Sequence, residues 1–286
     1  MDVTIGIIAY NEENNIKNLI QSLQNQKLSK IKIKKIIVVS SGSTDNTNRI
    51  IKKLIKKDKK IEFIIQKKRL GKASGINEFL KIAKSNILIL SSADIIPKKD
   101  AIENLCNPLI DKKIGICGCR PIPRINNQSI IGNIVKLQWL LHHKISIIKP
   151  KFGEMVAFRN IIKKIKNTAA DEEYIAMKIK QNNLKGYYAK NAIINNYGPK
   201  NISDLIKQRR RIHWGHLELI KKNTYKTASL NYITIFKEII KIIKVNNFYI
   251  IIFAIILEGY SRLLGSIDYY INKNYYIWEI SKSTKK

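Results

Sequence analysis

One carboxylate stands alone where an apolar run meets a loop. In NILILSSADIIP, residues 86–97, four consecutive apolar residues are followed at once by two serines, an alanine and Asp94. A short apolar run closed by small polar residues is typical of a buried strand that ends in a loop. Taken alone, the segment favours a structural role for Asp94 in capping the next turn, because Asp is common in turns and before Pro. The other polar segments of the chain bear on that choice.

Three further segments carry groups that are compatible with a nucleotide. The first strand-like run ends in a loop that contains Glu12, and the loop SSGSTDNT combines a glycine and hydroxyls with Asp45. The segment KKRLGKASGIN offers Gly71 for close backbone approach and Lys72 as a phosphate cation at the start of a helix. It is not a Walker A loop, because the first glycine and the Ser/Thr of that motif are absent. Each segment is weak alone, but four in order indicate a common site.

These segments follow strands in an alternating pattern of strands and helices. Strands are expected at 3–10, 34–40, 60–66, 86–90 and 113–119, with helices between them. Continuous apolar runs separated by helices of this length predict an α/β fold with a mostly parallel sheet and helices on both faces. Ligands of such sheets bind outside the carboxyl ends of the strands. The polar segments are therefore expected to meet at one edge of the sheet.

The second half of the chain contains three clusters of functional groups. FGEMVAFRN places Gly153 and Glu154 beside an apolar stretch, TAADEEYIAMKIKQ groups three acids at the start of a helix, and LIKQRRRIHWGHLELI contains three consecutive arginines. Acids are also favoured at a helix N-terminus for electrostatic reasons. The arginines would equally suit a solvated or membrane-facing surface. For each cluster, the functional and the structural interpretation stay open at this point.

An apolar segment lies near the C-terminal end. Residues 245–265 contain an apolar run that is too short to span a bilayer alone, followed by Glu258 and Arg262. A spacing of four would let these two residues pair on one helical face. An amphipathic stretch, residues 231–244, precedes the segment. The segment could cross a membrane, lie in its interface or be a buried helix, and membrane contact is favoured.

Composition adds a strong positive charge. Lys and Arg number 53 against 21 Asp and Glu, which gives a formal net charge of +32 and suggests nucleic acid or an anionic membrane as a partner. The abundance of Ile, Lys and Asn is also typical of an AT-rich genome, in which lysine fills many neutral surface positions. The three cysteines have no paired spacing and no histidines that complete a zinc site, so we expect buried thiols in a reducing compartment.

The order of these motifs resembles glycosyltransferase family 2, inverting sugar-nucleotide transferases with the GT-A fold. The resemblance covers residues 3–215 as an ordered series, in which SSAD takes the place of D-x-D. The other members of the series are IIAYNEENNI, VVSSGSTDNT, RLGKASGIN, GEMVAFR, ADEE and QRRRIHW, the last similar to Q-x-x-R-W. It implies a GT-A catalytic domain over residues 1–222 and a helical, membrane-associated region over residues 223–286.

The resemblance also implies roles for individual residues. The nucleotide-sugar site would comprise Ala9, Tyr10, Glu12, Ser41, Asp45, Gly71, Lys72, Asn77, Ala93 and Asp94. The acceptor and diphosphate side would comprise Gly153, Glu154, Gln208, Arg210, Arg211 and Trp214. Asp94 would help to hold a divalent cation, Mg²⁺ or Mn²⁺, at the donor diphosphate. Glu172 matches the position of the catalytic base, with Asp171 as its alternative.

Three departures from the family pattern matter. Ser92 occupies the first Asp position of D-x-D, and serines at 40 and 41 occupy a paired-acid position. In Q-x-x-R-W, Ile212 stands in the Trp position and Trp214 lies two residues further on. The intact motif accompanies processive polymer synthases in the family. Its partial loss therefore implies transfer of a single sugar.

The resemblance predicts an inverting glycosyltransferase at the cytoplasmic side of the cell membrane. Its donor would be a UDP- or GDP-sugar, and its acceptor a polyprenyl phosphate, another lipid-linked molecule or a glycan. A nucleotide-sugar-binding relative without catalysis is an alternative, prompted by the serine replacements, but Asp94 and the acidic and arginine clusters argue against it. A nucleic-acid-binding protein would need a focused basic face with interleaved aromatics. The lysines are spread along the whole chain, so no nucleic acid partner is expected.

Overall fold

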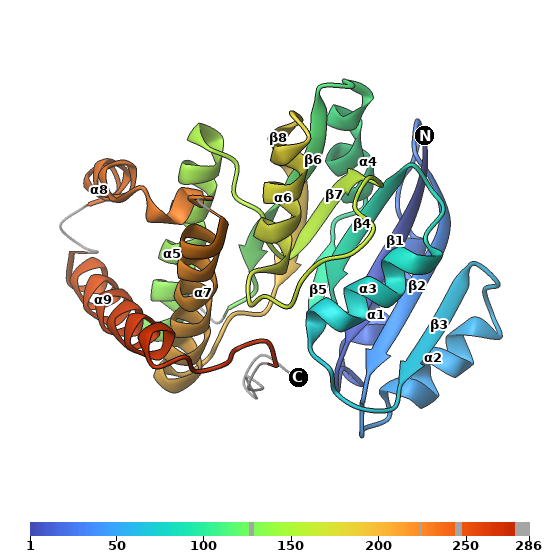
Figure 1. The fold of residues 1–286 in the computed structure, drawn as a ribbon, viewed down its shortest axis with the longest axis horizontal. Helices are drawn as coiled ribbons and strands as arrows, with labels where there is room; N and C mark the ends of the chain where they lie inside the picture. Colours follow the sequence, from blue (N-terminus) through green and yellow to red (C-terminus); the bar gives the residue numbers. More distant parts are fainter. Residues whose placement is uncertain (126–128, 224, 244–247, 278–286) are drawn as a thin grey trace.

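The structure, a computed structural model, describes residues 1–125, 129–223, 225–243 and 248–277. Its centre is an eight-stranded sheet with the strand order β3-β2-β1-β4-β7-β6-β8-β5 (Figure 1). The strands are β1 (Asp2–Ala9), β2 (Lys32–Ser41), β3 (Ile61–Gln66), β4 (Ile87–Ser92), β5 (Ile95–Pro97), β6 (Ile114–Pro123), β7 (Met155–Arg159) and β8 (Lys185–Asn196). The helices are α1 (Ile16–Gln24), α2 (Thr47–Ile55), α3 (Lys72–Ile82), α4 (Ala101–Cys106), α5 (Ile130–Ile148), α6 (Asp171–Gln181), α7 (Ile202–Asn223), α8 (Tyr232–Ile240) and α9 (Phe248–Tyr270).

The first half of the chain forms the parallel part of the sheet. Strands β3, β2, β1 and β4 pair in parallel. Because side chains alternate along a strand, Val38 and Ile87 pack under α1, α2 and α4, whereas Ile37 and Leu88 pack under α3 and α6. The predicted sheet with helices on both faces is therefore confirmed here. The three cysteines are free and buried, as predicted.

Strand β7 departs from the parallel pattern. It pairs antiparallel with both β4 and β6, and β5 pairs antiparallel with β8, while β6 and β8 are parallel. Four of the seven strand pairs are thus parallel. The antiparallel entry of β7 brings its first residues to the end of β4, where the backbone N–H of Ser92 donates to the carbonyl of Glu154 at 2.8 Å.

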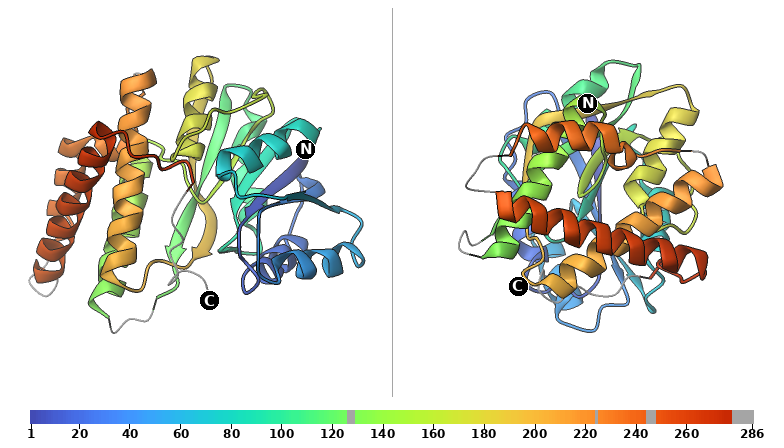
Figure 2. Two further views of the ribbon diagram at one scale, coloured as in Figure 1. Left: turned by 60° about the horizontal axis from the view of Figure 1, so that its bottom comes forward. Right: turned by 90° about the vertical axis from the view of Figure 1, so that its left-hand side faces the viewer.

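Helices α5, α7, α8 and α9 gather beside the sheet, on the side away from β3 (Figures 1 and 2). Three of them, α5, α7 and α9, share an apolar cluster to which α5 contributes Ile134 and Val135, α7 Leu205, and α9 Ala254 and Leu257. A common core therefore joins helices from both sides of the predicted boundary at residue 222.

Among the described residues, α9 is the only helix that is long and apolar enough to cross a membrane, and 33% of its most apolar stretch is buried. It accounts for most of the predicted segment 245–265, of which residues 245–247 lie outside the described residues. The predicted pair is confirmed: Arg262 Nε donates to Glu258 Oε1 at 2.6 Å. The outer faces of α8 and α9 are exposed and apolar, with Ile233, Phe236, Ile240, Phe248, Tyr249, Ile252, Ile255, Ile256, Tyr260 and Leu263.

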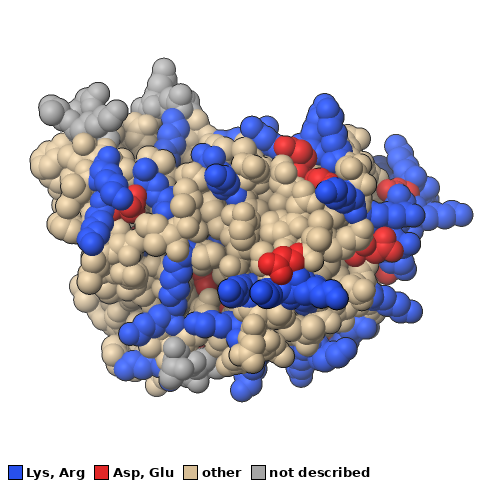
Figure 3. Space-filling model, turned by 90° about the horizontal axis from the view of Figure 1, so that it is seen from above, with Lys and Arg blue, Asp and Glu red and all other residues tan. Residues whose placement is uncertain are grey.

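Positive charge is distributed unevenly over the surface. On the face drawn in Figure 3, Lys and Arg are dense at the end that carries α2 and β3, whereas much of the opposite end, where α8 and α9 lie, is uncharged. The least charged end of this face thus coincides with the exposed apolar helices.

We predict that Gly6→Ala destabilises the fold by roughly 1–3 kcal/mol, the usual cost of overpacking a core. A Cβ at this position in β1 would lie 2.6 Å from the ring of Phe79 in α3. Gly259→Ala in α9 is the matched control, because its Cβ meets no atom within 4 Å and Ala is the better helix former. Urea unfolding measures both free energies. Equal values for the two variants would show that β1 and α3 do not pack as described.

Candidate active site

A cavity of about 360 Å³ opens at the carboxyl ends of the parallel strands. One wall comes from the ends of β1, β2 and β4 and from the start of α3, which parallel pairing brings to one edge of the sheet. The rest of the lining comes from the start of β7, the end of β8, α7 and the segment after α9. Of the residues expected to bind a nucleotide, those in the lining are Ala9, Tyr10, Glu12, Ser41, Gly71, Lys72, Ala93 and Asp94. The Arg69 guanidinium also lines this cavity and lies 4.1 Å from the centre of the Tyr10 ring.

Asp45 and Asn77 lie outside this lining and hold loops in place. Asp45 accepts hydrogen bonds from the backbone N–H groups of Glu13, at 3.1 Å, and Thr47, at 3.0 Å. Asn77 exchanges two hydrogen bonds with the backbone of Ile165, with N–O distances of 2.8 and 3.0 Å. Asp45 therefore joins the loops after β1 and β2, and Asn77 anchors the loop before α6.

A second, larger cavity of about 500 Å³ lies between the sheet and helices α5, α7, α8 and α9. It shares part of its lining with the first cavity, and we call the shared residues the junction: Lys72, Ser92, Asp94, Glu154, Asn196, Gln208 and Arg211. Two ligands, one in each cavity, would meet at the junction.

An ion pair between Lys72 and Glu172 borders the junction. Lys72 begins α3 and Glu172 lies in the first turn of α6, and both side chains are 12% exposed. Burial lowers the pKa of Lys72, but the neighbouring Glu172 and Asp171 outweigh this effect and raise the pKa on balance. Burial likewise opposes ionisation of Glu172, yet Lys72 holds the pKa of that carboxyl below its usual value. Both partners are therefore charged at neutral pH.

Asp94 and Glu154 bring two carboxylates to the junction. Glu154 precedes β7 with a φ of 56°, a left-handed conformation that few residues other than Gly adopt, so the backbone is strained at this point. Burial, followed by the charges of Asp94 and Glu172, raises the pKa of Glu154 to about 8. A cation between the two carboxylates would relieve this repulsion.

The junction fits a divalent cation that also binds an anionic ligand. No group of three or more His, Cys, Asp or Glu side chains within the described ranges could hold a metal ion by itself. Mg²⁺ typically takes one or two carboxylates from the protein and leaves its other positions to phosphate oxygens and water. Asp94 and Glu154 meet that requirement.

The three acids at the start of α6 have three different environments. Asp171 is fully buried, neither of its carboxylate oxygens has a hydrogen-bond partner among the described residues, and burial raises its pKa to about 7. Glu173 accepts hydrogen bonds from the Phe152 N–H, at 3.2 Å, and the Tyr225 hydroxyl, at 3.1 Å. Of the two expected catalytic carboxylates, Glu172 lines the larger cavity and Asp171 does not.

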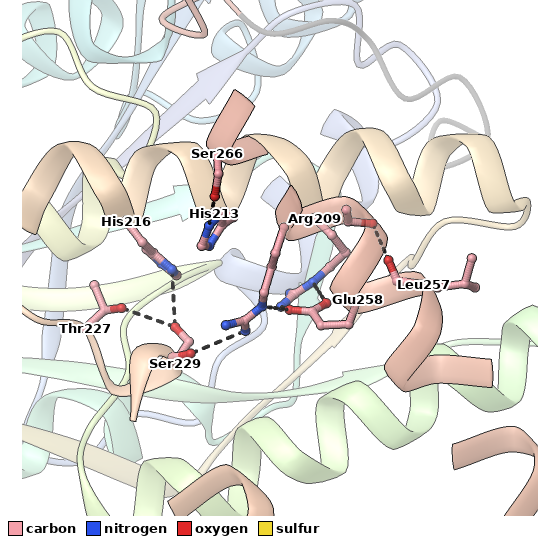
Figure 4. A network of polar contacts seen from close by, with 10 residues as sticks. Arg209, His213, His216, Thr227, Ser229, Leu257, Glu258 and Ser266 are labelled. Carbon is pink, nitrogen blue, oxygen red and sulfur yellow. Dashed lines mark hydrogen bonds and ion pairs between the residues drawn. The ribbon is translucent and has the colours of Figure 1, made fainter. Parts of the chain in front are cut away.

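The three consecutive arginines of α7 point in different directions. Arg211 lines both cavities. Arg209 donates two hydrogen bonds to Glu258 of α9, at 2.7 and 2.8 Å, and Arg210 forms an ion pair with Asp268 further along α9 (Figure 4 shows the first). Since each helical residue is rotated by about 100° from the last, neighbours do not share a face. The arginine run therefore ties α7 to α9 and is not a solvated surface.

The residues expected on the acceptor and diphosphate side are divided by the structure. Glu154, Gln208 and Arg211 line both cavities. Gly153 lines only the larger cavity and Arg210 only the smaller one. Trp214 lines neither cavity; its ring packs against three aromatic side chains, Tyr269, Tyr275 and Tyr276.

Sequence reasoning missed residues that complete the smaller cavity. Asn196 ends β8, and the polar turn that follows this strand was the available signal. Lys273 and Tyr275 belong to the segment after α9 and also line the cavity. The carbonyl of Tyr276 lies so close to Gly71 that a Cβ there would be 2.5 Å away. No local pattern marks this segment, because it reaches the site only through the position of α9.

The sequence matches a known family and named relatives. The family described as Glycosyl transferase family 2 matches residues 4–151, slightly more than half of the chain. Poly-beta-1,6-N-acetyl-D-glucosamine synthase from Staphylococcus aureus is 28% identical over 263 residues, which cover 84% of this chain and 62% of that protein. The protein of the same name from Staphylococcus epidermidis is also 28% identical, over 84% of this chain and 61% of its own length. The chain thus spans less than two thirds of these relatives.

Solved structures share the fold at low sequence identity. Mannosyltransferase PcManGT from Pyrobaculum calidifontis, in complex with GDP-Man and Mn²⁺, has a TM-score of 0.70 at 18% identity, over 95% of this chain and 88% of its own. Staphylococcus aureus TarS 1–349 with UDP-GlcNAc has a TM-score of 0.53 at 16% identity, over 77% of this chain and 67% of its own. Glucosyl-3-phosphoglycerate synthase from Mycobacterium tuberculosis, with Mn²⁺, UDP and glucosyl-3-phosphoglycerate, has a TM-score of 0.51 at 16% identity, over 74% and 77%. These likenesses confirm the predicted GT-A fold.

We predict that the Glu173→Gln variant loses less stability than the wild type as the pH rises from 4.5 to 7. Burial raises the pKa of Glu173 from 4.5 to about 7, so in this range the folded protein keeps a proton that the unfolded chain has released. The free energy of unfolding therefore falls as the pH rises through this window, and an amide, which does not titrate, lacks that contribution.

Urea unfolding at pH 5 and pH 7 measures this effect. The variant should gain stability relative to the wild type between the two pH values. Glu78→Gln, which removes a carboxylate paired with Lys81 at the surface, is the control and should show a much smaller change. The same difference between Glu173→Gln and the wild type at both pH values would contradict the prediction.

Proposed function

The chain belongs to glycosyl transferase family 2, and on that premise we propose that it is an inverting enzyme that moves a single sugar from a UDP- or GDP-sugar to a lipid-linked or glycan acceptor at a membrane. The observation that carries the proposal is the junction, where two cavities share Lys72, Asp94, Glu154 and Arg211. A donor in the smaller cavity and an acceptor in the larger one would meet between these charged groups.

The smaller cavity suits the nucleoside diphosphate of the donor. The stacked Tyr10 and Arg69 offer an aromatic ring and a planar cation to uracil or guanine. Lys72 and Arg211 supply positive charge for the diphosphate, and charge-assisted hydrogen bonds to phosphate are among the strongest in proteins. Structures that share the fold contain GDP-Man, UDP-GlcNAc or UDP, so both bases remain candidates.

Asp94 and Glu154 would hold a divalent cation, Mg²⁺ or Mn²⁺, beside the diphosphate. When bound, the cation stabilises the negative charge that develops on the leaving nucleoside diphosphate. Carboxylate oxygens are the ligands that such hard cations prefer. Two of the structures with this fold contain Mn²⁺, which supports the assignment.

Glu172 is the proposed base for a hydroxyl acceptor. It lines the larger cavity, whereas the alternative, Asp171, is fully buried. Glu172 Oε1 accepts a hydrogen bond from Lys72 Nζ. A diphosphate that draws Lys72 toward the donor would free Glu172 Oε1 to take the acceptor proton as the acceptor oxygen attacks the anomeric carbon from the opposite side.

Transfer of a single sugar is favoured over polymer synthesis. Ile212 stands in the Trp position of Q-x-x-R-W and lines the larger cavity, while Trp214 is packed among tyrosines. The exposed apolar faces of α8 and α9 would contact the bilayer at its cytoplasmic side, where nucleotide sugars are available.

We predict that Asp94→Asn lowers metal-dependent turnover by about 100-fold or more, because the substitution keeps the shape of the side chain and removes the charge that a cation needs. Release of nucleoside diphosphate by the purified protein is measured with a panel of UDP- and GDP-sugars, Mn²⁺ or Mg²⁺, and extracted membrane lipids as acceptors. Asp2→Asn, at an exposed pair with Lys34, is the matched control. If Asp94→Asn turned over substrate as fast as the wild type, Asp94 would be only a turn residue. If the wild type itself were inactive, the alternative of a nucleotide-sugar-binding protein without catalysis would be favoured.

We predict that the double variant Ile233→Asp, Phe236→Asp binds anionic liposomes at least about tenfold more weakly than the wild type, because two apolar side chains no longer enter the bilayer. These α8 residues are 71% and 64% exposed. Ile110→Asp changes an apolar residue that is 58% exposed and remote from α8, and it serves as the control. Liposome sedimentation measures the partition, and a wild type that stays in the supernatant would refute membrane contact.

A further inference from the structure

The larger cavity changes character along its length. Near the junction its lining is charged, and farther out α5, α8 and α9 supply an apolar lining that includes Val135, Ile145, Ile235, Ile251 and Ala254. Tyr232 and Ile255 also line the cavity and are 60% and 51% exposed. The apolar end therefore reaches the exposed faces of α8 and α9. A ligand that filled the cavity would have a polar reacting end and an apolar tail.

A cluster of partly buried cations lines the cavity, and we call Lys151, Arg209 and Arg262 the cationic collar. Both arginines donate to Glu258, with N–O distances of 2.6–2.8 Å, so that one carboxylate is shared by two guanidinium groups. Figure 4 labels Arg209 and Glu258 of this group. Arg262 Nη1 is buried and has no hydrogen-bond acceptor among the described residues. Burial and the charge of Arg209 lower the pKa of Lys151 to about 8. Glu173, which also lines the cavity, and Glu258 both favour the charged form of Lys151. The three cations of the collar thus face two carboxylates, and an excess of positive charge remains.

We propose that the acceptor is a lipid monophosphate, whose phosphate lies between the cationic collar and the junction and whose hydrocarbon chain lies between α5, α8 and α9. This inference rests on the proposed glycosyltransferase function. Charge complementarity selects the headgroup, because a phosphate dianion offsets the excess positive charge of the collar. The apolar lining selects the chain, the rest of which emerges where the exposed faces of α8 and α9 would meet a bilayer.

The transfer to such an acceptor balances without a base. An oxygen of the lipid phosphate attacks the anomeric carbon and forms a new C–O bond. The bond from that carbon to the β-phosphate of the donor breaks, and its electron pair leaves with UDP or GDP. The attacking oxygen is already anionic at neutral pH, so no proton has to be removed. Glu172 can then remain paired with Lys72, because a phosphate acceptor does not need it as a base.

Other occupants fit the cavity less well. A glycan needs hydrogen-bond partners along its length, whereas the outer lining consists mainly of aliphatic side chains. A neutral lipid alcohol would leave the collar's excess charge buried without an anion, which is unfavourable.

The first experiment compares acceptors for the purified full chain in detergent, with the preferred nucleotide sugar and Mn²⁺. The probes are farnesyl phosphate, methyl phosphate, farnesol and dodecyl β-glucoside. We expect kcat/KM for farnesyl phosphate to exceed that for each of the others by at least about tenfold, because each lacks either the chain or the charge. Equal or faster transfer to farnesol, to the glucoside or to methyl phosphate would overturn the inference.

The second experiment locates the chain with two matched variants of α9. Ala254→Phe fills the apolar part of the cavity, and Ile256→Phe places the same ring on the exposed face, outside the lining. The ratio of kcat/KM for farnesyl phosphate to that for methyl phosphate should fall about tenfold in Ala254→Phe and stay constant in Ile256→Phe. General damage to the enzyme lowers kcat/KM for both substrates equally. An unchanged ratio of the two values in Ala254→Phe would therefore refute this placement of the chain.

The third experiment tests the headgroup. Arg262→Gln should raise KM about tenfold for both phosphates and leave their ratio unchanged, the opposite pattern to Ala254→Phe. Arg49→Gln at the surface is the control. An unchanged KM in Arg262→Gln would remove Arg262 from the phosphate site, and the acceptor comparison with the wild type still decides the proposal if this variant does not fold.

Slow release of nucleoside diphosphate in the absence of any acceptor separates the two levels of the proposal. A wild type that releases nucleoside diphosphate but glycosylates no lipid phosphate would overturn this inference alone. A wild type that turns over no nucleotide sugar under any condition would sink the proposed function together with it.

Discussion

The burial of opposite charges at the junction is the constraint on which the rest of the structure depends. Four carboxylates are held close to two cations and largely out of water, namely Asp94, Glu154, Asp171 and Glu172 around Lys72 and Arg211. Buried charges are tolerated only when they are paired, and no single element supplies both signs. The ends of β4 and β7 and the helices α3, α6 and α7 therefore have to converge. Burial, together with the remaining negative charge of neighbouring carboxylates, raises the pKa of Glu154 and Asp171, and a cationic ligand would offset that charge.

Helix α7 extends this constraint to the apolar side of the molecule. Arg211 faces the junction, while the two preceding arginines bind Glu258 and Asp268 of α9. One rigid helix thus fixes how far the charged site lies from the exposed apolar face of α9. Helix α9 is for this reason a wall of the larger cavity as well as the proposed membrane-contacting surface, and the same side chains set its position and the geometry of the site.

The sequence predicted the first half of the fold well, because each strand and helix there has a clear period. It did not predict α5, which is apolar on most sides, or β8, in which polar residues interrupt the pattern. Local spacing identified the pair of Glu258 and Arg262, but their third partner, Arg209, lies 49 residues away from Glu258. The sequence predicted which loops form the candidate site, but it predicted less well which of their side chains line it. Asp45 and Asp94 both follow strands, yet only Asp94 lines a cavity, because the backbone of each loop sets the direction of its side chains.

The segment after α9 returns to the smaller cavity, where Lys273 and Tyr275 form part of the wall and Tyr276 packs on Gly71. A chain leaves the ribosome with its N-terminus first, so the parallel strands and α3 can fold while this wall has not yet been synthesised. The cavity is complete only after α9 has emerged and docked on α7. Each newly made molecule can therefore finish this cavity only after its most apolar described helix, α9, has been made, although the strands that form the other wall are made much earlier.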